Sequence, residues 1–236
     1  MTTVKEHNMG FKPAMALAIL RGTKTMTRRL ITPRNSYYDG GPVRKARWEE
    51  LDWASPDIFV DKGPSPSGNS GPYLHVPDKD CDCTHRIYPR YQPGDGLWGR
   101  ERHSIGSDMS GRQIIATHLD DADGRLVIGE SQVMHPEAPE GSRSWCLQWK
   151  RRPSIHMPRW ASRITLEVTG VRVERLQDIS EQDALSEGIT YHDLPNNGLD
   201  PMRARTWFRG LWESINGPGS WALNPYVWVI QFRRLP

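Results

Sequence analysis

The sequence predicts an α+β protein in which a small set of strands is flanked by short helices and interrupted by two long insertions. Residues 164–173 and 227–232 alternate apolar and polar side chains, as half-buried strands do. Residues 207–215 repeat large apolar side chains at helical spacing. Segments over about 35–90 and 104–150 interrupt this order; the first is rich in Gly, Pro and Ser. With 236 residues and 36% hydrophobic content, we expect a single domain spanning 1–236.

Charge, cysteine content and hydrophobic runs indicate which partners and which cellular compartment to expect. The chain has 31 basic and 28 acidic residues, so a nucleic-acid partner has to be inferred from local clusters of Arg and Lys. Cys81, Cys83 and Cys146 cannot all pair with one another, which favours a reducing compartment. The apolar run 14–20 is short and has no cleavage site, and no later run approaches membrane-spanning length. We therefore expect a cytoplasmic protein with no membrane partner.

Three helices are predicted from their end signals. The first begins at Pro13 and ends before Gly22, a residue suited to a left-handed cap. The second begins after Ser180 and ends before Gly188, so that Glu187 is its last residue. The third runs from Asp200-Pro201 to Asn216-Gly217. Its apolar stripe is expected to face the core and consists of Trp207, Phe208, Leu211, Trp212 and Ile215.

Four stretches occur in the order found in one known family. They are "ILRGTKTMTRR", "QPGDGLW", "ITLEVTGVRVERLQDISEQDALSEGI" and "YVWVIQF". In this order they resemble the ASCH (activating signal cointegrator homology) family, and the long insertions resemble ASCH proteins carried by bacteriophages and prophages. The resemblance covers about residues 10–30, 91–103 and 155–236 and leaves both insertions out. It implies a small PUA-like β-barrel.

The resemblance also implies an activity. The family contains bacterial amidohydrolases that remove the acetyl group from N4-acetylcytidine, and their G-x-K-T-x-T motif is filled here by Gly22, Lys24, Thr25 and Thr27. Their catalytic lysine and threonine then correspond to Lys24 and Thr27. Their catalytic glutamate, near the end of the helix after the long strand, corresponds to Glu187. The expected substrate is a nucleobase or nucleoside such as N4-acylcytidine.

Amide hydrolysis needs a nucleophile, a base for its proton and a donor for the developing oxyanion. The hydroxyl of Thr27 is too weakly acidic to attack unaided. Lys24 can serve as the base if burial and the neighbouring Arg28 or Arg29 disfavour its ammonium form. Glu187 can protonate the leaving amine or orient a water molecule. This chemistry requires no cofactor.

Further residues are expected to bind the substrate or a polymer. Substrate binding is assigned to Thr25, Arg28, Arg29, Arg100 and Glu101, the last two as an ion pair that lines the pocket or lies on the surface. Phosphate contacts are assigned to Lys150, Arg151, Arg152 and His156, with RNA favoured over DNA as partner. These residues keep two alternatives open. One is a non-catalytic module that binds a modified base in RNA or DNA, and the other is an ASCH-type ribonuclease in which His156 matters more than Thr27.

A metal site is the less favoured interpretation of "CDCTH". The segment offers Cys81, Cys83 and His85, with His75 upstream. Zinc sites usually have two residues between their cysteines, and a single intervening residue strains tetrahedral chelation. We therefore expect no metal.

Overall fold

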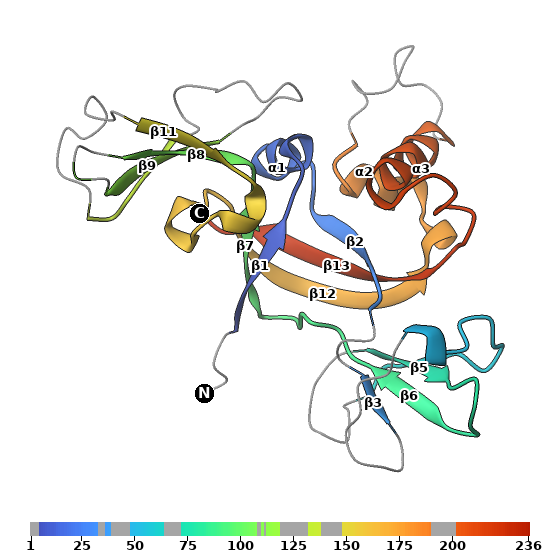
Figure 1. The fold of residues 1–236 in the computed structure, drawn as a ribbon. Helices are drawn as coiled ribbons and strands as arrows, with labels where there is room; N and C mark the ends of the chain where they lie inside the picture. Colours follow the sequence, from blue (N-terminus) through green and yellow to red (C-terminus); the bar gives the residue numbers. More distant parts are fainter. Residues whose placement is uncertain are drawn as a thin grey trace. The chain divides into compact units, whose positions relative to one another are not determined.

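The structure is a computed structural model that describes residues 5–32, 36–38, 48–63, 72–107, 110, 112–118, 132–137, 148–189 and 202–236 (Figure 1). It confirms the α+β prediction, with many strands and few helices. Two compact units form. The first unit comprises Met1–Thr25, Asp95–Glu167 and Arg233–Pro236, and the second unit comprises Met26–Gly94 and Val168–Phe232. The prediction of a single domain stays a prediction, since β12 and β13 contribute residues to both units.

The predicted strands belong to a five-stranded sheet with the order β1-β7-β12-β13-β2. Its members are β1 (Glu6–Gly10), β7 (Gly96–Arg100), β12 (Thr165–Arg175), β13 (Tyr226–Arg234) and β2 (Met26–Leu30). β1 pairs with β7 in parallel, whereas β7 with β12 and β13 with β2 are antiparallel. Among the described residues the sheets are open and none closes into a barrel.

Each insertion contains a four-stranded sheet, of which the sequence indicated only a possible hairpin with one arm at 112–119, where β9 (Gln113–His118) lies; its other arm, 125–129, lies outside the described residues. In the second unit, the order β3-β6-β5-β4 is formed by β3 (Ser36–Tyr38), β6 (Thr84–Ile87), β5 (Tyr73–Pro77) and β4 (Phe59–Asp61). In the first unit, the order β10-β9-β8-β11 is formed by β10 (Gln132–Met134), β9 (Gln113–His118), β8 (His103–Ser107) and β11 (Gln148–Arg152). The Gly and Pro content of the first insertion indicated loops because such residues are rare inside strands.

The three predicted helices are present. α1 (Pro13–Leu20) ends before Gly22, whose φ of 78° is the left-handed geometry predicted for it. α2 (Glu181–Ser186) begins after Ser180, whose hydroxyl accepts a hydrogen bond from the Asp183 amide at 3.1 Å. α3 (Met202–Asn216) lies beside α2 in the second unit (Figure 1) and ends before Gly217. Short 3-10 turns are η2 (Trp48–Glu50), η4 (Ser154–His156), η5 (Arg159–Ala161) and η6 (Leu176–Asp178). Within the described residues, no helix is long and apolar enough to span a membrane.

The core of the second unit lies between α2, α3 and strands β2 and β13. Phe208 and Trp212 are buried there together with Met26, Val227 and Val229. The predicted stripe of α3 is wrong at its margins, because Trp207 and Ile215 are 42% and 50% exposed. The buried line of the helix has a residue every four positions, at Ala204, Phe208 and Trp212. Trp207 and Ile215 lie beside this line.

The β3–β6 sheet contains a hydrogen-bonded acid and phenol. The Tyr73 hydroxyl donates to Oδ2 of Asp61 at 2.6 Å, and the Gly63 amide donates to Oδ1 at 2.8 Å. The bond from Tyr73, followed by that from Gly63, holds the pKa of Asp61 below its ordinary value. The same bond raises the pKa of Tyr73. The pair therefore stabilises the fold while Asp61 is ionised and Tyr73 is protonated.

We expect Tyr73→Phe to raise the pKa of Asp61 toward its ordinary value. Because the folded pKa of Asp61 is lowered, its contribution is present above about pH 4 and is lost as the pH falls through the folded pKa. The raised pKa of Tyr73 extends the contribution to about pH 10. Carboxyl chemical shifts in an NMR titration measure the change, with Tyr226→Phe as a control that removes a phenol from β13. An unchanged Asp61 titration in Tyr73→Phe would contradict this account.

Candidate functional site

Strand β2 carries two of the predicted site residues to opposite faces of the sheet. Thr27 lies opposite Ile230 of β13, and Arg28 lies opposite Val229. Since successive side chains of a strand point to alternate faces, Arg28 shares its face with Met26, and Thr27 shares the other with Arg29. The Met26 face packs on the core of the second unit. Arg28 is therefore directed toward α2 and α3.

Three carboxylates surround the Arg28 guanidinium. Its Nε donates to Oε1 of Glu174 at 2.9 Å, its Nη2 to Oδ2 of Asp183 at 2.7 Å and its Nη1 to Oε1 of Glu187 at 3.3 Å. Nη2 also contacts Glu174. The Arg28 side chain is completely buried and lies over the ring of Phe208, 5.8 Å from its centroid. A buried guanidinium of this kind requires such partners, because removing a charge from water is costly.

Arg172 completes what we call the Arg28 cluster: Arg28, Arg172, Glu174, Asp183 and Glu187. Arg172 of β12 donates to Oε2 of Glu174 at 3.1 Å and also pairs with Asp183. Two guanidinium groups thus contact three carboxylates. Glu187, at 4% side-chain exposure, is far more buried than Glu174 or Asp183.

Helix α2 positions two of these acids. Ser180 caps its N-terminus, and the Glu187 amide donates to the Asp183 carbonyl at 2.9 Å, so the two acids are one turn apart on the same face. Like charges at this spacing repel each other. Arg28 contacts both carboxylates and offsets that repulsion. Gly188, with a φ of 94°, then turns the chain away after Glu187.

The pKa values of the two arginines of β2 shift in opposite directions, although burial lowers both. Burial alone lowers the pKa of Arg28, but the charges of Glu174 and Glu187 and the hydrogen bonds with Asp183 and Glu174 outweigh it, so the pKa is raised above its ordinary value. For Arg29, burial dominates and lowers the pKa, while Tyr91 and Glu187 act in the opposite direction. Arg28 is thus held charged by its partners, and Arg29 lies within the electrostatic reach of Glu187.

The three residues assigned to catalysis are all buried. Exposed fractions are 4% for Lys24, 5% for Thr27 and 3% for Glu187. Lys24 and Thr25 belong to the first unit, where the Lys24 amide donates to the Ala18 carbonyl at 3.1 Å just after α1. Thr27 and Glu187 belong to the second unit. The convergence of Lys24 with Thr27 and Glu187 stays a prediction.

Arg100 and Glu101 have partners other than each other. Glu101 is fully buried and accepts hydrogen bonds from Nε and Nη2 of Arg163 at 3.1 and 2.7 Å. Arg100 donates to the Ile155 carbonyl at 3.4 Å. The predicted Arg100–Glu101 ion pair is therefore replaced by a Glu101–Arg163 pair, in keeping with the opposite directions of adjacent side chains at the end of β7. Their role in substrate binding stays a prediction.

The basic segment predicted to contact phosphates lies on β11 of the first unit. Lys150 and Arg151 are exposed, Arg152 is partly exposed, and β11 pairs with β8 from Gln148↔Ser107 to Arg152↔His103. Alternation directs Lys150 and Arg152 to one face of the strand and Arg151 to the other. His156 is exposed in η4. These residues are accessible to a polymer.

Sequence reasoning did not identify the acidic partners of Arg28. Glu174 and Asp183 are 146 and 155 residues away along the chain, a separation at which no local pattern indicates contact. A weak signal existed: Arg172 and Glu174 share one face of a strand, and Asp183 and Glu187 share one face of the next helix. Asp183 and Glu187 carry like charges one turn apart, which favours a cation from elsewhere in the chain beside them.

Comparison with known proteins gives no match to a family model, a curated protein or a solved structure.

We expect Arg28→Met to lower the free energy of unfolding by about 3–5 kcal/mol, because it leaves buried carboxylates without their cation. The matched control is Arg233→Met. Arg233 pairs with Glu167 at 2.7 Å, but its side chain is 66% exposed, and the expected loss is at most about 1 kcal/mol. Urea unfolding of the three proteins measures both changes. Equal losses in the two variants would refute a central role for Arg28.

Proposed function

We propose that the chain is a cytoplasmic PUA-like hydrolase of the ASCH family that removes an acyl group from N4-acylcytosine or N4-acylcytidine without a cofactor. The observation that carries the proposal is the burial of Lys24, Thr27 and Glu187, none more than 5% exposed. Lys and Glu are seldom fully buried unless they are paired, and Glu187 has Arg28 as such a partner; buried ionisable groups of this kind are also typical of active sites. The same three residues fill the motif positions of the amidohydrolases that the sequence resembles.

In the proposed reaction, Lys24, Thr27 and Glu187 act as base, nucleophile and acid. The Lys24 amine takes the hydroxyl proton of Thr27 as its oxygen adds to the acyl carbon. The bond between the acyl carbon and N4 then breaks, and the leaving amine receives a proton through Glu187. Water hydrolyses the acyl-threonine ester and restores the hydroxyl. The net change is one amide and one water converted to one amine and one carboxylic acid.

Arg28 acts in this proposal as a positioning residue. Its contact with Oε1 of Glu187 at 3.3 Å restrains the carboxylate after the end of α2. Strand alternation directs Thr27 and Arg28 to opposite faces of β2, so the proposal requires the substrate to reach Thr27 and Glu187 around this strand, and their joint use stays a prediction.

We expect Glu187→Gln to lower kcat for N4-acetylcytidine by about 10²–10⁴-fold, the usual contribution of an acid–base group, and Thr27→Ala to abolish turnover. The matched control is Asp183→Asn, which weakens another carboxylate contact of Arg28 without altering the proposed catalytic groups. It should retain kcat within a few-fold. Mass spectrometry of the released cytidine measures turnover in all three variants.

Two results would refute the proposal. The first is wild-type protein that leaves N4-acetylcytidine and larger N4-acyl cytidines intact. The second is a loss in Asp183→Asn as large as that in Glu187→Gln, which would assign the effect to the stability of the Arg28 cluster.

A second candidate is a non-catalytic module that binds RNA along β11, the last strand in the order of its sheet. The observation that favours it is the exposure of Lys150 and Arg151 on one strand, next to Arg152 and the exposed His156. Lysine and arginine at such a surface neutralise phosphates and displace condensed counter-ions, whatever the base sequence. Binding of this kind is compatible with a base-specific pocket elsewhere in the chain.

For this candidate we expect Arg151→Ala/Arg152→Ala to reduce the salt dependence of binding to single-stranded RNA. Each phosphate contact contributes about 0.7 to the slope of log K against log salt, so the slope should fall by roughly 1.4. Fluorescence anisotropy at several salt concentrations measures it. The control is Arg233→Ala/Arg234→Ala, which removes two exposed arginines from β13. An equal change in both double variants would contradict a specific role for β11.

A further inference from the structure

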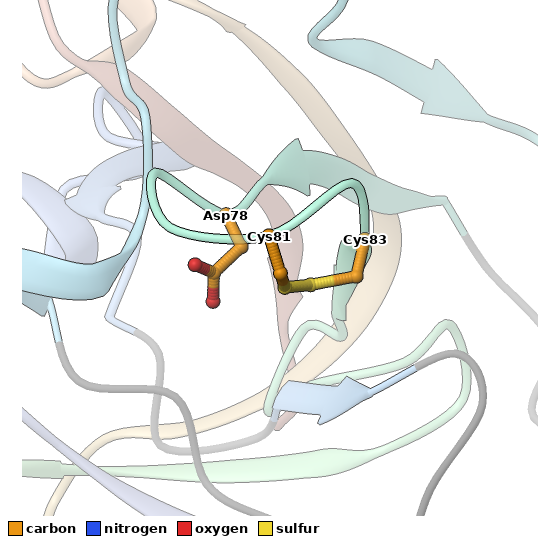
Figure 2. Close-up of side chains that lie close together, drawn as sticks. All are labelled: Asp78, Cys81 and Cys83. Carbon is orange, nitrogen blue, oxygen red and sulfur yellow. A yellow bond between two sulfur atoms is a disulfide. The ribbon is translucent and has the colours of Figure 1, made fainter.

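The connection between β5 and β6 brings two thiol sulfurs and a carboxylate together. Figure 2 shows Asp78, Cys81 and Cys83 on this turn, with the two sulfurs joined as a disulfide. The candidate ligand atoms of all three residues lie within 4.8 Å of one another. Sequence reasoning singled out the cysteines and His85, but not Asp78.

We propose that the reduced Cys81–Cys83 pair and Asp78 form a binding site for a thiophilic divalent cation of the zinc class. Two thiolates and one carboxylate are a donor set that suits zinc, and three protein ligands leave a fourth tetrahedral position for water. The site is separate from the Arg28 cluster and does not depend on the proposed hydrolase activity.

A tetrahedral ion requires the two sulfurs, which are bonded to each other in the disulfide, to move apart after reduction. Metal–sulfur and metal–oxygen bonds of about 2.3 and 2.0 Å place neighbouring ligand atoms roughly 3.5–3.8 Å apart. The Cα atoms of Cys81 and Cys83 are 5.3 Å apart, whereas residues two apart in an extended strand are separated by roughly 6.6–6.8 Å. The backbone is thus bent at Asp82 and brings the two cysteines closer together than an extended strand would.

Hydrogen bonds hold the Asp78 carboxylate in place. Nε2 of the buried His85 lies 2.8 Å from Oδ2, and the Asp80 amide donates to Oδ1 at 2.9 Å. The Asp78 amide itself donates to the Cys83 carbonyl at 2.9 Å, which closes the turn. Each carboxylate oxygen can accept a second interaction. His85 therefore acts as a positioning residue that orients the carboxylate, as partners of metal ligands commonly do.

The charges of the turn favour a cation. Asp80 and Asp82 are exposed beside the ligands, and the lysine of the turn, Lys79, is directed away from them, since its Nζ donates to the Glu49 carbonyl at 2.8 Å. Binding replaces the two thiol protons by the metal and releases them to solvent. The disulfide form has no thiolate to offer, so the site exists in the reduced protein.

The test is a titration of the full, chemically reduced chain with Co²⁺, followed by displacement with Zn²⁺. We expect one Co²⁺ per chain, with a thiolate-to-cobalt absorption band that Zn²⁺ removes. Cys81→Ser and Cys83→Ser should each abolish the band, and Asp78→Asn should weaken binding at least tenfold. Asp82→Asn and Cys146→Ser are the controls, and both should bind as the wild type does. Far-UV circular dichroism verifies that each variant is folded.

The proposal fails if Co²⁺ binds without a thiolate band, if the band survives in both cysteine variants, or if Asp82→Asn weakens binding as much as Asp78→Asn. Oxidation of the wild type to the disulfide should eliminate binding, and binding that persists after oxidation would also overturn it. His85→Gln should weaken binding while keeping the absorption band, because it alters the orientation of a ligand and not its identity.

Discussion

The buried guanidinium of Arg28 joins three segments that are remote in sequence. It lies on β2 and contacts Glu174 of β12, Asp183 of α2 and Glu187 just after that helix. A positive charge in this position requires carboxylates, and carboxylates this close together require a positive charge. The mutual requirement links α2 to β2 and β12 in addition to the apolar packing of the same elements.

The same interaction links the architecture of the second unit to its proposed chemistry. An acid that transfers protons must keep a defined position when the substrate leaves. Glu187 follows the last turn of a six-residue helix, where a side chain would otherwise be mobile. Its contact with Arg28 supplies the restraint. The other two acids, Glu174 and Asp183, are only partly buried, so the cluster is in partial contact with solvent.

Local signals in the sequence were sufficient for the elements that frame the site. Alternation indicated β12 and β13, and the capping residues Ser180 and Gly188 indicated α2, because these signals depend on neighbouring residues only. Trp207 was misjudged, since spacing alone does not distinguish the centre of an apolar stripe from its margin. Apart from a possible hairpin arm at 112–119, the sheets of the two insertions were not predicted, because pairing between short strands depends on distant partners that composition does not reveal. The contacts of Arg28 were missed for the same reason.

The most direct test of the central claim is a double-mutant cycle between Arg28 and Glu187, measured as free energies of unfolding. Arg28→Met, Glu187→Gln and the combined variant are compared with the wild type in urea. If Arg28 fixes Glu187, the two substitutions should be non-additive by about 1–3 kcal/mol, with the second change costing less once the first is made. Additivity within about 0.5 kcal/mol would show that the two side chains act independently and would contradict the account.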